Sequence, residues 1–476
     1  MAQGAAADTN ADATPLLAAR TESAEPRRKR NMFPFAFAAL ASMTTVLMDL
    51  AVMSGAELFI REDLGLTDEQ VEVLAGSMNV YMLASILAAG WAADVLGRRG
   101  ALVLANAFLV AGALAMSLGG GFAALMAARF VTGVGVGLAH VVAPVYNAEI
   151  APASTRGVLS SLLDIFINVG ILLGYVSNYA FAGLPVHLGW RVMYALGVFP
   201  PVLVAAGVLM MPESPRWLTL RGRDADARAV LVRTSDTVGE ADLRLEEIKQ
   251  AVTAPQDDDG GGGVWKELLV RPSATVRRKL TCVVGLQFFQ EASGIEAIVL
   301  YSPLVFRHAG MSSDTTVLGA TVAVGVVKTL FILVATFLSD RLGRRPLLLA
   351  STAGVAATMA SLAAALCVGA TSACVASVLG FVVAFSVGFG PLVPAYSAEI
   401  LPLRLRAQGT GIGTAVGRLT CGLVSMTFIS LAGAITMAGC FFLYAGVAAA
   451  ACVFVYAQLP ETRGRSLEGM DELFAK

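Results

Sequence analysis

The apolar residues of this chain are arranged in runs that are separated by short, charged segments. Each run is about 20 residues long, which is the length of a helix that spans the hydrocarbon core of a membrane. We therefore expect an all-α membrane protein with twelve transmembrane helices. The predicted spans are residues 34–59, 71–93, 101–120, 123–146, 158–182, 190–211, 280–307, 316–339, 346–369, 372–397, 407–431 and 435–459.

The overall composition supports this interpretation. Hydrophobic residues make up 56% of the 476 residues and charged residues only 14%, whereas an ordinary soluble domain has about 25% charged residues. The mean hydropathy is +0.71, an excess of apolar residues that no soluble core could absorb. The sequence also lacks a nucleotide-binding glycine motif, a cluster of metal-ligand residues and the context of a hydrolytic triad. We therefore expect neither an enzyme nor a protein that binds a metal, a cofactor or nucleic acid.

The positive charges are distributed unequally between the two sides of the predicted membrane. All but six of the 34 Lys and Arg residues lie on the side of the N-terminus, the central loop and the C-terminus. The exceptions are Arg61, Arg191 and Arg307 on the other side and Arg129, Lys328 and Arg418 inside predicted helices. Because Lys and Arg are enriched in cytoplasmic loops, we expect both termini to be cytoplasmic.

Three signatures occur twice in the chain, in the same order and with nearly the same offset. They are VYNAEIAPASTRG at Val145 and AYSAEILPLRLRAQG at Ala395, GWAADVLGRR ending at Arg99 and ATFLSDRLGRR ending at Arg345, and PESPR at Pro212 and PETRGR at Pro460. The economical explanation is two homologous six-helix halves. Repeats of this kind place the substrate site between the halves, near the middle of the bilayer.

The chain therefore divides into five predicted parts. They are a disordered cytoplasmic N-terminal tail (1–31), an N-terminal six-helix half (32–211), a cytoplasmic central loop (212–279), a C-terminal six-helix half (280–459) and a cytoplasmic C-terminal tail (460–476). The tail before residue 32 has no apolar run with a cleavage site, so it is not predicted to be a signal peptide.

Charged residues are concentrated where the repeated signatures leave the predicted membrane. We interpret them as a gate that latches the two halves together on the cytoplasmic side while the substrate site faces outward, and that breaks when the site faces inward. Simple anchoring by positive charges is the alternative. The predicted gate residues are Asp94, Arg98, Arg99, Glu149, Arg156, Glu213, Arg216, Asp340, Arg344, Arg345, Glu399, Arg406, Glu461 and Arg463.

Four of these motifs together resemble the sugar porter family of the major facilitator superfamily. They are GxxxDxxGRR at Gly90, RFVTGVGVG at Arg129, PESPRWL at Pro212 and PETRGRSLE at Pro460. The resemblance covers residues 32–470. Within the family, QEASGIEAIVLYSP at Gln290 and AVGVVKTLFILVATF at Ala323 resemble the plant polyol and monosaccharide branch. The resemblance implies the major facilitator fold and proton-coupled symport of a polyol or monosaccharide by alternating access.

The same resemblance assigns proton coupling to two charges inside predicted helices. Asp49 occupies the position of the family's proton-binding aspartate and Arg129 that of its arginine partner. A carboxylate in dry surroundings gains proton affinity and loses it when a guanidinium approaches, so such a pair can load and release a proton. A permanent structural ion pair is the alternative. The sequence LMDLAV stands where the family usually has GYD-x-GV.

A polar stripe in the fifth predicted span suits a substrate that carries rows of hydroxyl groups. Asp164, Asn168, Tyr175 and Asn178 fall on one face of that helix, although polar residues also serve as hydrogen-bonding contacts between helices. The resemblance places Asp164 at a substrate-contacting position. Together with the stripe it implies a substrate site formed by Asp164, Asn168, Ile171, Gln290, Glu291, Glu296, Lys328, Pro394 and Gly417. We also expect Gly294 to break the seventh helix.

Three of these positions depart from the family pattern. Glu291 and Gly417 replace amides, and Pro394 replaces a tryptophan that stacks on the sugar. Two alternatives to symport therefore stay open, a facilitative uniporter and a sugar sensor that does not transport. The expected partners are a polyol or monosaccharide, protons and the lipid bilayer, and we expect a functional monomer. The plasma membrane is the expected location, and the acidic dileucine pattern from Asp12 to Leu17 leaves an internal, vacuolar membrane open.

Overall fold

The computed structural model describes residues 33–151, 153–235, 237–253, 266–270 and 272–462. In these ranges the chain is helical, without strands. The first half contains α1 (Phe33–Leu64), α2 (Asp68–Leu118), α3 (Phe122–Ile150), α4 (Ala153–Phe181), α5 (Val186–Leu196) and α6 (Phe199–Leu209). Between the halves lie α7 (Pro215–Leu220), α8 (Asp224–Thr234), α9 (Val238–Thr253) and the π-helix η1 (Lys266–Val270). The second half contains α11 (Ala274–Ala292), α12 (Ile295–His308), α13 (Asp314–Leu342), α14 (Arg344–Val368), α15 (Thr371–Ala384), the π-helix η2 (Phe385–Phe389), α16 (Gly390–Ile400), α17 (Leu403–Ile435) and α18 (Met437–Gln458).

The twelve predicted spans are recovered. Eleven helical stretches in the described part of the chain are long and apolar enough to cross a membrane. One of them, α2, is 51 residues long and bends at Gly97, whose φ of +83° lies in the left-handed region. It therefore covers the predicted span 71–93 and all but the last two residues of the span 101–120. The φ value also explains why a glycine stands at this turn.

The seventh span is broken where the sequence predicts it. Helix α11 ends at Ala292 and α12 begins at Ile295, with Gly294 between them at a φ of +88°. A Cβ atom at Gly294 would lie 2.8 Å from the Tyr444 ring, so this glycine is required by both its backbone conformation and its neighbour. The break turns the chain within the bundle and lets residues on either side of it line one site.

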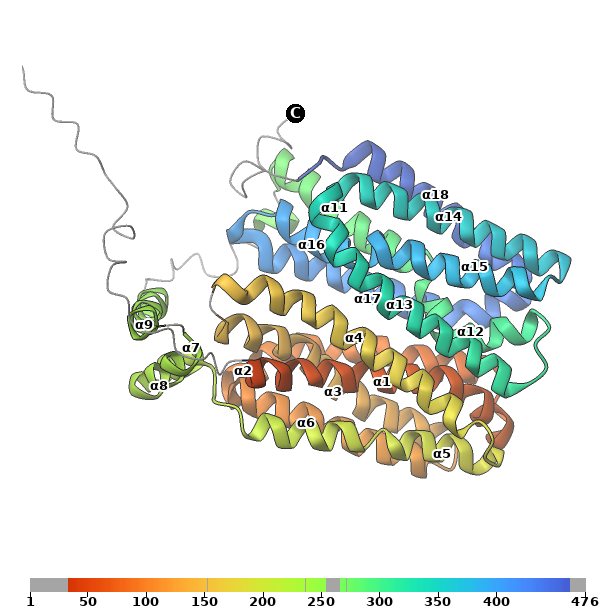
Figure 1. Cartoon of the computed structure of the whole chain (residues 1–476), viewed down its shortest axis with the longest axis horizontal. Helices are drawn as coiled ribbons and strands as arrows, with labels where there is room; N and C mark the ends of the chain where they lie inside the picture. The colour runs from red at the N-terminus through yellow and green to blue at the C-terminus, as the bar shows by residue number, and fades with distance from the viewer. Residues whose placement is uncertain (1–32, 152, 236, 254–265, 271, 463–476) are drawn as a thin grey trace, which may run out of the picture.

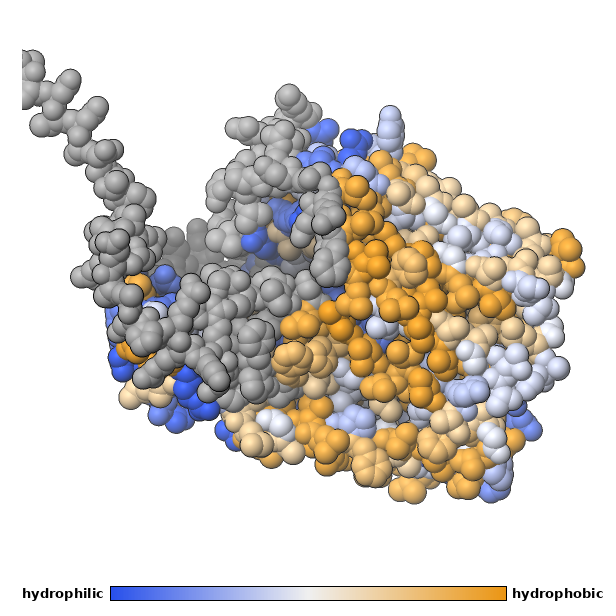
Figure 2. Space-filling view, in the orientation of Figure 1, coloured by the Kyte–Doolittle hydropathy of each residue, from blue (hydrophilic) through white to orange (hydrophobic). Residues whose placement is uncertain are grey.

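Small residues bring neighbouring helices together in the first half. A Cβ atom on Gly133 of α3 would lie 2.6 Å from the Cβ of Tyr81 on α2, and one on Gly137 would lie 2.6 Å from the Cβ of Ser85. Such close approach is a common device of membrane helices, which gain little from apolar burial against one another in lipid. The flank of the bundle is correspondingly apolar in Figure 2. Large apolar side chains such as Leu87 and Met210 are exposed in the structure.

Helices α7 to α9 lie at one end of the bundle (Figure 1), which we call the terminal end. They share a small apolar cluster that includes Leu218, Leu231 and Leu245. The Arg244 guanidinium donates hydrogen bonds of 3.2 to 3.5 Å to the last carbonyls of α3 and to that of Ala151, a favourable place for a cation. On the exposed side, the hydrogen bond from Arg228 lowers the pKa of Asp242.

The two halves are joined toward the other end, which we call the opposite end. Glu72 of α2 accepts hydrogen bonds from the Ser430 backbone N–H of α17, at 2.9 Å, and from the Ser430 hydroxyl. Nearer the middle, the Tyr175 hydroxyl of α4 donates to the Val299 carbonyl of α12 at 2.5 Å. The halves are drawn in red to yellow and in green to blue in Figure 1, and these hydrogen bonds join them away from α7 to α9.

Candidate functional site

The predicted charge pair in the first half is formed. Arg129 of α3 places its Nη1 atom 3.2 Å from Oδ2 of Asp49, which lies midway along α1. The Arg129 side chain is 0% exposed and that of Asp49 is 11% exposed. The Nε and Nη2 atoms of Arg129 have no hydrogen-bond partner among the described residues. A fully buried guanidinium with one carboxylate contact is therefore only partly satisfied.

A second buried acid near this pair escaped the sequence analysis. Glu57 of α1 is 3% exposed, and its Oε2 atom has no hydrogen-bond partner in the described part of the chain. The positive charges that act on it are those of Arg129 and Arg61. Its position inside an apolar run was the available signal, but the run alone does not show which of its residues face the bundle interior.

The polar stripe on α4 divides into two groups. Tyr175 bonds to Val299, and Asn178 donates from Nδ2 to the Ala51 carbonyl of α1 at 3.0 Å, so these residues connect helices. Farther toward the terminal end, Asn168 donates to the Asp164 backbone carbonyl at 2.7 Å while its Oδ1 atom has no described partner. The Asp164 side chain is half-buried and that of Ile171 is buried. Asp164 and Asn168 thus remain the stripe residues suited to a ligand.

In the second half, Gln290 supports the broken helix. Its Nε2 atom donates at 3.0 Å to the carbonyls of both Phe389 and Gly390, where η2 meets α16. Pro394, one turn farther along α16, is exposed. The Gly390 carbonyl has no helical N–H donor four residues on, because residue 394 is a proline, and the amide of Gln290 supplies a donor to it. The described bonds of Gln290 therefore give it a structural role beside any contact with substrate.

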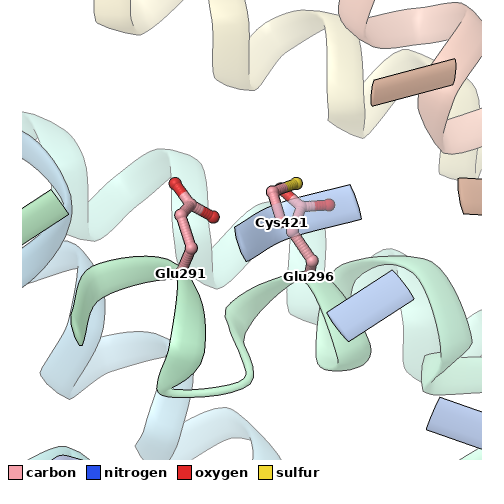
Figure 3. Close-up of side chains that lie close together, drawn as sticks. All are labelled: Glu291, Glu296 and Cys421. Carbon is pink, nitrogen blue, oxygen red and sulfur yellow. The ribbon is translucent and has the colours of Figure 1, made fainter. Parts of the chain in front are cut away.

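Two acids from either side of the break lie together (Figure 3). Ligand atoms of Glu291, Glu296 and Cys421 lie within 4.8 Å of one another, and the Oε2 atoms of both glutamates have no described hydrogen-bond partner. Such a group could coordinate a metal ion by its spacing, but the positive charges of Lys328 and Arg418 act on it and oppose a cation. Free carboxylate oxygens can instead accept hydrogen bonds from hydroxyl groups.

The departures at positions 291 and 417 fit one another. A Cβ atom at Gly417 of α17 would lie 3.0 Å from Oε1 of Gln287 and 3.7 Å from Cγ of Glu291. The side chain that the family usually has at position 417 would occupy the space beside these two residues. With glycine at position 417 the side chains of Gln287 and Glu291 border that space, so the two changes fall in one region of the site.

The predicted gate residues of the first half form a compact network at the terminal end. Arg98 contacts both oxygens of Glu149, at 3.0 and 3.1 Å, and Asp94 at 3.0 Å. Glu213 accepts bonds from the backbone N–H groups of Arg98 and Arg99. The turn at Gly97 presents these N–H groups to the Glu213 carboxylate.

The second half repeats this network. Arg344 lies 3.2 Å from Glu399, and Glu461 accepts bonds of 3.1 Å from the backbone N–H groups of Arg344 and Arg345. The hydroxyl of Tyr396 bonds to the carbonyl of Pro460, as that of Tyr146 bonds to Pro212. The sequence repeat is therefore also a repeat of hydrogen bonds.

These described ion pairs lie within each half and not between the halves. Arg406 donates to the Leu401 carbonyl, and Arg216 is exposed. The side chains of Arg156 and Asp340, and all of Arg463, lie outside the described residues. A latch between the halves thus stays a prediction about another conformation.

Comparison with known proteins places this architecture in a family. The pattern of the family described as "Sugar (and other) transporter" matches residues 32–474. The chain belongs to this family. Among its relatives, "Polyol transporter 5" of Arabidopsis thaliana is 51% identical over 469 residues, covering 94% of this chain and 87% of the relative. "Glucose transporter GlcP" of Staphylococcus epidermidis is 34% identical over 429 residues, covering 89% and 93%.

Solved structures of the xylose transporter XylE from E. coli share the fold of this sugar transporter family member. The inward-open conformation of XylE superposes with a TM-score of 0.78 at 26% identity and covers 93% of this chain and 100% of XylE. A structure titled as the proton:xylose symporter XylE bound to 6-bromo-6-deoxy-D-glucose gives a TM-score of 0.75, also at 26% identity, and covers 94% and 100%. The twelve-helix major facilitator fold is confirmed. The chain is a membrane transporter for sugars or polyols and not an enzyme.

Proposed function

We propose that this sugar transporter carries a polyol or monosaccharide together with a proton by alternating access. The observation that carries the proposal is the buried pair of Asp49 and Arg129, held at 3.2 Å inside membrane-spanning helices. An ionisable residue at such a depth costs several kcal/mol unless it is paired, and it marks an ion pathway in many transporters. The description of XylE as a proton:xylose symporter and the names of the polyol transporters support the same assignment.

Protonation of Asp49 changes the balance of charge around Arg129. Asp49 is the more exposed member of the pair, so a proton can reach it while the guanidinium stays buried. Neutral Asp49 attracts the guanidinium less strongly and frees α1 and α3 to move relative to one another. After substrate leaves, loss of the proton restores the pair and resets the carrier.

The contacts between the halves support alternating access. The described hydrogen bonds that cross between them lie from the middle toward the opposite end, whereas the described ion pairs of the terminal end stay within each half. We assign the terminal end to the cytoplasm because it carries most of the Lys and Arg residues. In the outward-facing state, the Arg98 and Arg344 networks meet and latch the halves there.

Substrate binds between the halves, in contact with Asp164 and Asn168 from one side and with Glu291 and Glu296 from the other. The unpaired oxygens of Asn168, Glu291 and Glu296 accept hydrogen bonds from substrate hydroxyl groups. A polyol offers several such donors, so it satisfies acceptors that the protein leaves without partners.

Uptake into proteoliposomes with and without an imposed pH gradient tests the proposal, with linear polyols, cyclic polyols, hexoses and pentoses as substrates. We expect the gradient to drive accumulation of at least one of them. Asp49→Asn should bind substrate and exchange labelled for unlabelled substrate, yet fail to accumulate it. Asp68→Asn, which alters an exposed acid paired with Arg61, is the control and should accumulate normally.

Two results would contradict proton coupling. Equilibrating uptake that ignores the pH gradient would identify a uniporter. Substrate binding without any uptake would identify a sensor. Accumulation that persists in Asp49→Asn would place the proton at another acid.

A further inference from the structure

We propose that Glu57 is a second proton-binding carboxylate beside Arg129 and that it shares one proton with Asp49. This inference rests on the proposed proton coupling and adds a residue to it. The coupling site would then contain two acids of one helix that compete for one buried guanidinium.

Complementary unsatisfied atoms are the first observation behind this assignment. Arg129 has two nitrogen atoms without described partners, Nε and Nη2, and Glu57 has one oxygen atom without a described partner, Oε2. Buried donors and acceptors are rarely left unpaired in proteins, because each one costs free energy. If the guanidinium shifted from Asp49 toward Glu57, an unpaired nitrogen of Arg129 could donate a hydrogen bond to the unpaired Oε2 atom of Glu57.

The depth of the residues in the bundle is the second observation. Glu57 lies seven residues before the end of α1 at Leu64, and Arg129 lies seven residues after the start of α3 at Phe122. Both helix termini lie at the opposite end, so each residue is about 10 Å from that end at 1.5 Å per residue, whereas Asp49 is about 22 Å from it. The backbone of Arg129 is thus closer in depth to Glu57 than to its present partner.

Charge balance then requires a proton. Two ionised carboxylates and one guanidinium carry a net negative charge, and an unbalanced charge is costly in a low-dielectric interior. One proton held by either acid makes the group neutral. Because Glu57 lies on the side of Asp49 that faces the opposite end, it is also the acid that a proton entering from that end meets first.

The other groups around Glu57 do not neutralise it in this structure. Arg61, on the same helix, is paired with Asp68 at 2.6 Å. Tyr194 of α5 and Tyr301 of α12 lie within its electrostatic reach, and their hydroxyl groups point to Met53 and to the Ser425 carbonyl. Among the described residues, Arg129 is the buried cation whose charge acts on Glu57.

The test compares Glu57→Gln with the unmodified protein in the proteoliposome assay, as a function of external pH. Without the second acid, the pair of Asp49 and Arg129 is balanced with no proton bound, so Asp49 takes up a proton only from more acidic solution. We expect the pH of half-maximal uptake to fall by about one unit and gradient-driven accumulation to decline, while counterflow exchange persists. Glu62→Gln makes the same change at an exposed position five residues farther along α1 and should leave the profile unchanged.

A conservative variant separates proton binding from packing. Glu57→Asp keeps a carboxylate, so we expect it to retain gradient-driven accumulation although its side chain is shorter. An Asp variant that behaves like the Gln variant would assign Glu57 a packing role and overturn the proposal, as would a Gln variant with the pH profile of the unmodified protein. Failure of the unmodified protein to respond to the gradient would instead overturn the proposed proton coupling.

Discussion

At the scale of single residues, the candidate substrate site contains buried hydrogen-bond acceptors that have no described donor. Oxygen atoms of Asn168, Glu291 and Glu296 are buried without described partners, and they come from both halves. A polar atom in that condition destabilises the empty carrier and is satisfied when a hydroxyl group arrives. The empty site therefore favours a substrate that is rich in donors.

This arrangement leads to a prediction for Asp164, whose side chain is half-buried on the same face of α4 as Asn168. Asp164→Asn replaces one acceptor oxygen by a donor, so it should weaken the preferred polyol and change the order of preference among substrates. Loss of a hydrogen bond to a charged group corresponds to about 1.5 to 3 kcal/mol, or roughly ten- to a hundredfold in affinity. Competition binding with the same substrate panel measures it. An unaltered order of preference would assign Asp164 a structural role.

At the residue scale, the sequence predicted the ion pair between Asp49 and Arg129 but did not predict the buried acid Glu57. The Asp49–Arg129 pair was predicted from family resemblance and is formed. Glu57 was missed because an apolar run predicts a helix without specifying which of its faces is buried. Tyr175 and Asn178 share a helical face with Asp164, yet they bond to neighbouring helices, and spacing alone cannot distinguish a ligand from such a contact.

At the scale of elements, the break between α11 and α12 controls the geometry of the site. Glu291 precedes the break and Glu296 follows it, and the turn at Gly294 brings their oxygens together. The sequence predicted the break because a glycine lies among polar residues inside an apolar span. It did not predict the π-helix η2, whose last residue, Phe389, accepts a hydrogen bond from Gln290 of another helix, a tertiary contact that the local sequence does not reveal.

We therefore predict that Gly294→Ala disrupts the carrier. Alanine in the left-handed region costs about 1 to 2 kcal/mol, and its Cβ atom would press on the Tyr444 ring. The variant should show a lower melting temperature and much weaker substrate binding. Gly369→Ala is the matched control, because Gly369 also has a positive φ, of +71°, but no atom within 4 Å of an added Cβ. Equal effects in the two variants would show that backbone strain alone, and not the packing at the break, is responsible.

The whole molecule is a two-part structure whose halves are joined at one end. The sequence repeat predicted two halves, and it placed charged gate residues, Arg98 and Glu149 among them, together on one side of the membrane. It could not show whether the ion pairs lie within a half or between halves, since each half carries both the arginines and the acids that either arrangement needs. Nor did it single out Glu72, a 1% exposed acid that joins α2 to α17.

The bond between Glu72 and Ser430 has a consequence for the balance between conformations. If it holds the opposite end closed, then Ser430→Ala removes the hydroxyl donor and leaves only the backbone N–H group, so the carrier should spend more time open at that end. A charged hydrogen bond of about 1.5 kcal/mol changes such an equilibrium by roughly tenfold.

Hydrogen–deuterium exchange should rise in the first turns of α2 and in the last turns of α17. Exchange should fall in the residues of α3 and α16 at the terminal end, because the networks of Arg98 and Arg344 come together there in the alternative state. Thr427→Ala is the control, since the Thr427 hydroxyl bonds to the Leu423 carbonyl of its own helix and lies on the exposed side of α17. Exchange that rises at both ends together would indicate loosening of the fold, and exchange that changes at neither end would show that Glu72 and Ser430 do not hold the closure.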